Sequence, residues 1–234
     1  MYHAIGRGDR TVVTLERFAG HMRWLREESG LSVAPLMDAV AAIPRLGTAV
    51  ALTFDDGDRS VLERAVPVLA RHGLPCTVFV IGDHLRRPLA SDRYLDVSAL
   101  RELAAVPGVS IGAHGATHRP LPALDDVRLD EELRRSVEAL SDVLGRRPAV
   151  MSYPHGAVDR RVVSFVARAG FEAAATSLLG VNRPRTARLR LRRTEIDTFD
   201  DTRRFSGKVH GDYDWYQLKQ RLYWPALPVE TGRG

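Results

Sequence analysis

Short apolar runs alternate with helix-like runs along most of this chain, and the alternation constrains the fold more than any other feature. Runs typical of buried strands lie at 49–54, 76–81, 109–113, 148–153, 172–176 and 189–196. Segments typical of helices lie at 14–29, 58–72, 97–106, 127–145 and 157–169. This βα repetition predicts a parallel sheet. With 234 residues, 44% of them hydrophobic, the chain is long enough for one α/β domain with a substantial core.

Two of the predicted strands end in side chains that suit a metal ion. The first ends in TFDDG, with Asp55 and Asp56, and the third is followed by His114 and His118 in the sequence HGATH. In α/β folds the carboxyl ends of strands carry the chemistry. One carboxylate and two imidazoles form a metal set, and the second carboxylate stays free to take a proton from a metal-bound water.

Each of these motifs also has an ordinary interpretation when it is taken alone. Asp-Asp-Gly is among the commonest turn signals, and an isolated HxxxH is a weak metal signal, because Gly115 and Pro120 indicate a loop rather than a helix. A third strand end, YPHG at 153–156, is equally compatible with a simple turn. The prediction of a metallohydrolase depends on finding such residues at successive strand ends.

The order and spacing of TFDDG, HxxxH and a strand ending in PHG resemble the polysaccharide deacetylase family, also called the NodB-homology domain or carbohydrate esterase family 4. The flanking segments MYHAI at 1–5, GLPCTVFV at 73–80 and FSGK at 205–208 resemble it too. The resemblance implies an α/β fold of the distorted (β/α)7 barrel type over residues 1–223. Residues 224–234 are expected to form a C-terminal tail, and the segment 212–223 a terminal helix.

The resemblance also implies roles for individual residues. Asp55 matches the general base, and Asp56, His114 and His118 match the metal ligands. The backbone N–H of His155, at a position usually held by Tyr, would help to stabilise the oxyanion. Zn²⁺ is the expected ion, and the same ligands accept Co²⁺, Ni²⁺ or Mn²⁺. The implied reaction removes the N-acetyl group from an amino sugar in a glycan, a lipid- or nucleotide-linked sugar, or a small glycoside.

The chain departs from the commonest family pattern at two positions. Ser152 stands where many members carry an Arg that orients the base. Arg193 is a candidate replacement for this Arg. The alternative is that the charged run at 189–196, which contains Arg193, is a solvated edge strand. No C-terminal strand bears the Leu-x-His of the general acid. In a permuted branch of the family this strand is N-terminal, and His3 matches its His. The alternatives are that backbone groups simply satisfy His3, or that His210, in a predicted loop at 207–211, is the acid.

Composition narrows the expected partners and location. The net charge is +5, and almost all the basic residues are Arg. The dense groups of Arg at 183–193 and 203–204 suit an acidic glycan, a phosphate-linked sugar or lipid head groups. Alternatively, the high Arg content reflects genome composition. Basic repeats interleaved with aromatic residues are absent, which argues against nucleic acid. Cys76 lies in an apolar run and is expected in the core. No leader or transmembrane run is visible, which predicts a cytoplasmic protein or a sequence that begins within a longer one.

Two other classes of function fit parts of the pattern. Two His and one carboxylate also suit a non-haem Fe(II) oxygenase, but that interpretation leaves Asp55 without a task, and such sites usually lie on an antiparallel jelly roll. A carbohydrate-binding protein that kept the fold and lost activity is the other alternative, slightly favoured by the missing Arg of the third motif. The remaining histidines are expected in surface helices or loops: His21, His72 and His84.

Overall fold

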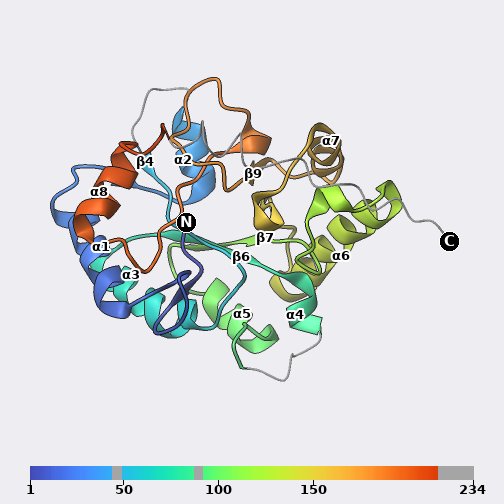
Figure 1. The fold of residues 1–234 in the computed structure, drawn as a ribbon. Coiled ribbons are helices and arrows are strands. Elements are labelled where there is room, and N and C mark those ends of the chain that lie inside the picture. Colours follow the sequence, from blue (N-terminus) through green and yellow to red (C-terminus); the bar gives the residue numbers. More distant parts are fainter. Residues whose placement is uncertain (44–48, 87–91, 216–234) are drawn as a thin grey trace.

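The central element of the fold is a parallel sheet of five strands. The computed structural model describes residues 1–43, 49–86 and 92–215 (Figure 1). The strands are β5 (Thr53–Phe54), β6 (Cys76–Val80), β7 (Val109–Ala113), β8 (Val150–Ser152) and β9 (Ala173–Ala175), and they neighbour one another in sequence order. This order is expected of successive βα units, and it confirms the predicted parallel sheet.

Helices follow the strands and cover the outside of the sheet (Figure 1). They are α1 (Leu15–Glu27), α2 (Leu36–Ala42), η2 (Val61–Ala65), α3 (Val66–His72), α4 (Gly82–Arg86), α5 (Val97–Ala104), α6 (Asp126–Leu144), α7 (Arg160–Arg168) and α8 (Thr202–His210). Asp96, Asp125 and Asp159 cap α5, α6 and α7, because each side chain accepts a hydrogen bond from the backbone N–H three residues later. Short 3₁₀ turns lie at η3 (Leu121–Ala123), η4 (Pro154–Gly156) and η5 (Arg188–Arg190).

The first residues of the chain extend the sheet beyond β5. The N–H of Tyr2 donates to the carbonyl of Thr53 over 2.8 Å, and the N–H of Asp55 donates back to the carbonyl of Tyr2 over 2.9 Å. Figure 1 shows the N-terminus at the centre of the molecule, beside the strands. Two short parallel pairs flank this region: β1 (Ala4–Ile5) with β2 (Val12–Val13), and β3 (Ser32–Val33) with β4 (Ala49–Val50).

The segment after η5 closes the ring. Leu191 bridges Ala175 of β9, while the amine of Met1 donates to the carbonyl of Thr194 over 2.9 Å and the N–H of Ile196 donates to the carbonyl of Met1 over 2.9 Å. The five strands, the N-terminal segment and the segment after η5 therefore form a closed ring. In this ring the N-terminal segment lies between the segment after η5 and β5. The fold is a distorted (β/α)7 barrel, as the motifs predicted.

Three predictions about secondary structure are wrong. Residues 189–196 do not form a regular strand, because η5 occupies 188–190 and only Leu191 makes a ladder bridge. Residues 207–211 are not a loop: α8 continues to His210, and Gly211 ends it with a left-handed φ of 85°. The predicted helix at 212–223 is therefore not present in its described part, 212–215. Residues 216–223 and the predicted tail at 224–234 lie outside the described residues.

The core is apolar and aromatic, and it contains one unexpected imidazole. Tyr2, Phe18 and Phe54 are fully buried and pack with ring centroids 5.3 to 5.9 Å apart. Cys76 is buried in β6, as predicted. His21 was expected at the surface but is fully buried. Burial is possible because both ring nitrogens have hydrogen-bond partners. Nδ1 lies 3.1 Å from Tyr2 Oη, and Nε2 lies 3.0 Å from a backbone carbonyl oxygen near α8. Such distant partners leave no local sequence signal.

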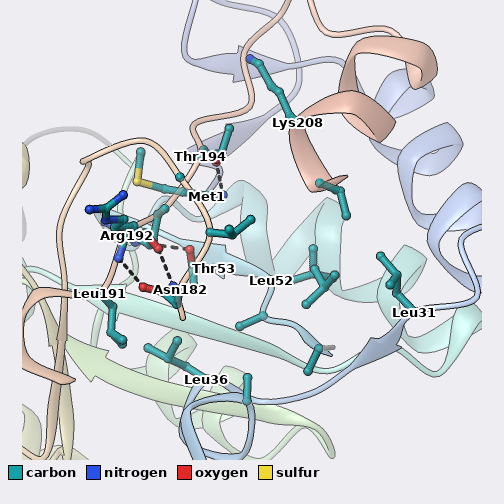
Figure 2. Close-up of a pocket in the computed structure, with 18 of the residues that line it drawn as sticks. Met1, Leu31, Leu36, Leu52, Thr53, Asn182, Leu191, Arg192, Thr194 and Lys208 are labelled. Carbon is teal, nitrogen blue, oxygen red and sulfur yellow. Dashed lines mark hydrogen bonds between the residues drawn. The ribbon is translucent and has the colours of Figure 1, made fainter. Parts of the chain in front are cut away.

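Beneath the closing segments lies a cavity of about 490 Å³ (Figure 2). Its wall includes Met1, Thr53, Leu36 and Leu191, and Figure 2 shows the side chain of Asn182 pairing with the backbone of Arg192. None of the predicted metal ligands lines it. Among the described helices, none has the length and apolarity that a membrane crossing requires.

Candidate metal centre

Three predicted ligands converge where β5 and β7 end. Asp56 follows β5, and His114 and His118 come from the loop after β7. One carboxylate oxygen, Asp56 Oδ1, lies 3.3 Å from Nε2 of both histidines, and one ligand atom from each residue lies within 4.8 Å of the others. Two imidazoles and one carboxylate that face a common point form the donor set of a three-ligand metal site. Such a site leaves coordination positions open for water and substrate.

The protonation of His114 is compatible with a metal. Its Nδ1 lies 2.9 Å from the carbonyl oxygen of Ser152, and since a carbonyl only accepts, Nδ1 carries the hydrogen. In the neutral ring the lone pair is therefore on Nε2, the atom that faces Asp56. Burial lowers the pKa of His114, but the carboxylates of Asp55 and Asp56 outweigh burial and raise it above its ordinary value. Asp56 Oδ1 is itself buried without a hydrogen-bond partner, as expected of an atom placed to bind a cation.

A buried carboxylate of α6 holds the loop that carries His118. Glu132 is only 4% exposed, and its Oε1 accepts hydrogen bonds from the N–H groups of Ala116 at 2.9 Å and Thr117 at 2.7 Å. Its Oε2 accepts from the hydroxyl of Thr117 at 3.0 Å. Sequence analysis missed this residue, because Glu132 stands in a helix among other charged residues and only the three-dimensional contact distinguishes it.

The site concentrates unusual backbone conformations. Among the described residues, only Asp56, His118 and His155 have positive φ without being glycine, with values of 70°, 64° and 57°. This left-handed region is unfavourable for L-residues, and it is adopted where the surrounding structure enforces it. The turns that present the site side chains are therefore set by the fold rather than by local preference.

Asp55 is bound by an arginine from the segment that follows η5. Arg193 makes a bidentate pair with it, Nη1 to Oδ1 and Nη2 to Oδ2, each at 2.7 Å, and Ser152 Oγ donates to Oδ2 at 3.0 Å. Asp55 is 3% exposed. Burial alone would raise its pKa, but the Arg193 guanidinium outweighs burial and holds the pKa of Asp55 well below its usual range. The carboxylate stays ionised beside the ligands, with Oδ2 3.9 Å from His114 Nε2.

The structure places His3 and His210 differently. His3 follows Tyr2 in the barrel wall, close enough to influence the pKa values of Asp55 and Asp56 electrostatically, and its Nδ1 lies 3.8 Å from Glu195 Oε1. His210 is exposed in the last turn of α8, where its Nδ1 meets the carbonyl of Ser206 at 2.9 Å and its ring contacts Trp24. Of these two predicted acids, His3 is the one that the fold brings to the site.

His155 lies beside the ligand loop. Its ring centroid is 4.5 Å from that of His118, and its Nε2 donates to the His118 carbonyl over 3.1 Å. Burial and the neighbouring His118 charge lower the pKa of His155. The imidazole therefore supports the loop. The predicted part of its backbone N–H in oxyanion binding stays a prediction.

Comparison with known sequences gives a consistent result. The family model described as polysaccharide deacetylase matches residues 43–174. The putative polysaccharide deacetylase YxkH of Bacillus subtilis (strain 168) is 26% identical over 181 residues, which cover 76% of this chain and 63% of the relative. The chitooligosaccharide deacetylase of Rhizobium leguminosarum bv. trifolii is 32% identical over 90 residues, or 38% of each chain. This chain thus matches less than two thirds of the length of these relatives.

Solved structures share the fold. The Streptococcus pyogenes deacetylase PplD in complex with acetate superposes with a TM-score of 0.80 at 21% identity, covering 89% of this chain and 96% of that one. IcaB from Ammonifex degensii gives a TM-score of 0.76 at 24% identity, with coverage of 90% and 95%. At these identities the likeness shows that the chain shares its overall fold with these proteins.

Proposed function

The chain belongs to the polysaccharide deacetylase family, and from this premise we propose that it is a metal-dependent hydrolase that removes the N-acetyl group from an N-acetylated amino sugar. One observation carries the proposal: the set Asp56, His114 and His118 lies next to a second carboxylate, Asp55, which is ion-paired and buried. A metal site with an adjacent unligated base is the arrangement that hydrolysis by a metal-activated water requires.

The ligands would hold Zn²⁺, or Co²⁺, Ni²⁺ or Mn²⁺, and the bound ion would polarise the acetamide carbonyl and lower the pKa of a water. Asp55 takes the proton of the attacking water, and Arg193 with Ser152 keeps its carboxylate ionised and correctly aimed. The backbone N–H of His155 donates to the developing oxyanion, an interaction that typically lowers such a barrier by about 3 kcal/mol.

The departing amine needs a proton, and we assign its supply to His3. Glu195 Oε1 lies 3.8 Å from His3 Nδ1. His3 and Asp55 come from neighbouring segments of the barrel wall, since Tyr2 bridges Phe54. An acid and a base on adjacent segments can serve two sides of one scissile bond.

The alternatives are less well supported by the same contacts. An Fe(II) oxygenase would leave Asp55, Arg193 and Ser152 without a function, and the ligands lie on a parallel barrel rather than a jelly roll. A binding-only protein was favoured by the missing third-motif Arg. The guanidinium of Arg193 now occupies the position next to Asp55, so that argument loses its force.

The first test measures metal and product together. His114→Ala and Asp56→Asn each remove a ligand at the end of a strand, so we expect folded protein without tightly bound divalent metal and without acetate release from N-acetylglucosamine oligomers. His72→Ala, which removes an imidazole at the end of α3, is the matched control and should keep both. Unchanged metal stoichiometry in both ligand variants would contradict the assignment. Metal binding without acetate release from any acetylated sugar would favour the binding-only alternative.

A further inference from the structure

The cavity beneath the closing segments has an apolar wall. Leu36 and Val40 of α2 line it together with Leu52 and Leu191, and all four side chains are buried in the protein. Figure 2 shows three of these leucines and Leu31 around the cavity. Protein interiors are close-packed, with few voids larger than a water molecule, whereas ligand sites have volumes of about 300–1,000 Å³. A cavity of about 490 Å³ therefore has the size of a binding site rather than of a packing defect.

The rest of the lining carries positive charge. Four basic side chains line the cavity: Arg183, Arg192, Arg193 and Lys208. Among the described residues that line it, none is Asp or Glu. The partners of two basic groups lie outside the lining, since Arg193 pairs with Asp55 and Lys208 Nζ donates to Asp200 Oδ2 over 2.5 Å. Arg183 is exposed and therefore lies at the mouth. An apolar wall with basic groups and no carboxylate favours an anionic ligand.

Hydrogen bonds hold the two segments that carry the arginines of the mouth. The side chain of Asn182 pairs with the backbone of Arg192: Nδ2 donates to the carbonyl over 2.9 Å, and Oδ1 accepts from the N–H over 2.8 Å (Figure 2). The N–H of Arg183 donates to Thr186 Oγ1 over 2.9 Å. A site whose backbone is already ordered loses less conformational freedom when a ligand binds.

The cavity is separate from the metal centre, although both touch the same arginine. Asp56, His114 and His118 do not line the cavity. Thr53 and Arg193 do, and Arg193 Nη1 donates to Thr53 Oγ1 over 3.3 Å and also pairs with Asp55. A ligand in the cavity can therefore contact Arg193 without contacting the metal ligands, so its binding should not depend on the metal.

We propose that this cavity binds an amphiphile with one alkyl chain and an anionic head group, a carboxylate or a phosphate. The alkyl chain packs against Leu36, Leu52 and Leu191, and the head group lies at the mouth beside Arg183. Burial of methylene groups supplies most of the affinity. A guanidinium group binds the oxygens of either head group through charge-assisted hydrogen bonds. This site goes beyond the proposed function, because it requires neither the metal nor an acetylated sugar.

The first test varies the ligand. Decanoate, decyl phosphate and decan-1-ol are titrated calorimetrically into the wild-type protein below their critical micelle concentrations. The better of the two anions should bind at least about tenfold more tightly than the alcohol, and it identifies the head group as that of a fatty acid or of an alkyl phosphate. Octanoate should bind about tenfold more weakly than decanoate. Equal affinity for the alcohol and both anions, or no binding of any of them, would overturn the proposal.

The second test fills the cavity. Ala39 on α2 and Ala51, which follows β4, both line it. Ala39→Phe and Ala51→Phe should each weaken decanoate binding about tenfold, because the new ring takes the space of the alkyl chain. Ala105→Phe adds the same ring at an exposed position at the end of α5, outside the lining, and is the matched control. Circular dichroism checks that each variant is folded. Wild-type affinity in a folded filling variant would contradict this location.

The third test locates the head group. Arg183→Gln should weaken decanoate binding about fivefold and leave decan-1-ol binding unchanged. Arg185→Gln, at an exposed position of the same segment outside the lining, should change neither and is the matched control. Asp56→Asn lacks a predicted metal ligand and should bind decanoate as the wild type does. Loss of binding in Asp56→Asn would place the carboxylate on the metal and overturn the proposal, and unchanged affinity in Arg183→Gln would reject the head-group site.

Discussion

The carboxyl ends of β5 and β7 differ from the segments that close the barrel in how they bring side chains to the site. We call the first region, with Asp55, Asp56, His114 and His118, the ligand edge, and the second, residues 1–3 and 191–196, the closing edge. The ligand edge comes from two motifs of five residues each. The closing edge joins the first three residues to a segment almost two hundred positions later, and its contact from Arg193 to Asp55 spans 138 positions. Metal ligands are thus placed by local turns, whereas the proton-transfer groups depend on closure of the whole ring.

The largest effect is expected where the two edges meet. Asp55→Asn keeps the shape of the side chain and removes the proton acceptor, so acetate release should fall by about 10² or more while the metal stays bound. Metal analysis and a turnover assay on the same sample check this. Asp56→Asn is the contrasting variant, since it should lose the metal as well. Near wild-type activity of metal-loaded Asp55→Asn would mean that Asp55 is structural.

A somewhat smaller effect is expected at the closing edge alone. The wild-type pH–rate profile should have an acidic limb from the base and an alkaline limb from an imidazolium, each reporting an apparent pKa. His3→Ala should remove or displace the alkaline limb and slow turnover about 10²-fold, with unchanged metal content. His210→Ala is the control, because that side chain lies on α8. If His210→Ala moves the limb instead, the N-terminal strand does not supply the acid.

A third variant tests whether metal binding at the ligand edge also depends on a residue outside its two sequence motifs. Glu132→Ala leaves two backbone N–H groups of the His118 loop without their acceptor, so metal affinity should fall about tenfold. Glu132→Gln keeps an acceptor oxygen and should lie closer to the wild type. Glu131→Ala, which removes an exposed neighbour on the same helix, should bind metal normally. Competition with a chromophoric chelator measures the affinity, and identical values for Glu132→Ala and wild type would exclude the role of Glu132.

The smallest effect concerns acid sensitivity of the closing edge. Burial lowers the pKa of His21, which supports Tyr2, from 6.5 to about 4. The unfolded chain therefore binds a proton between these values that the folded protein excludes, so stability is complete above pH 6.5 and falls as the pH drops toward 4. From pH 7 to 5.5 this residue should lower the free energy of unfolding by about 1 kcal/mol.

Denaturant titrations at several pH values measure this effect. His21→Gln should have a flatter stability profile between pH 7 and 5.5, whereas His72→Gln, at the end of α3, should keep the wild-type slope. Equal slopes for His21→Gln and wild type would show that His21 does not titrate in this range.

Sequence patterns predicted most of the barrel because each strand is an apolar run of its own. The predicted runs at 76–81 and 109–113 coincide with β6 and β7, and the family that the motifs indicated is confirmed. Arg193 could be named as a possible partner of Asp55 only through the family resemblance. Its segment was wrongly predicted as a regular strand, because its backbone groups pair with Met1 and Asn182 rather than with a continuous ladder.

The burial of His21 and the end of α8 were also not predicted from the sequence. His21 is satisfied by groups 19 and 179 positions away, so its burial leaves no periodic signature. The end of the last helix was misplaced because Gly207 was interpreted as a breaker, although it lies inside α8 and Gly211 is the cap. The roles of the seven predicted site residues stay predictions, and the variants above substitute four of them: Asp55, Asp56, His114 and His3.

The left-handed residues of the site have an evolutionary consequence. A non-glycine residue in this conformation costs roughly 1 kcal/mol of folding stability, and glycine adopts it more readily. In a lineage that no longer needed the reaction, substitution of Asp56 and His118 by glycine would not be selected against and would raise the stability of the protein. The turns would keep their backbone conformation, but two of the predicted metal ligands would be lost. An aspartate at position 56 and a histidine at position 118 are therefore what a lineage still under selection for metal binding would keep.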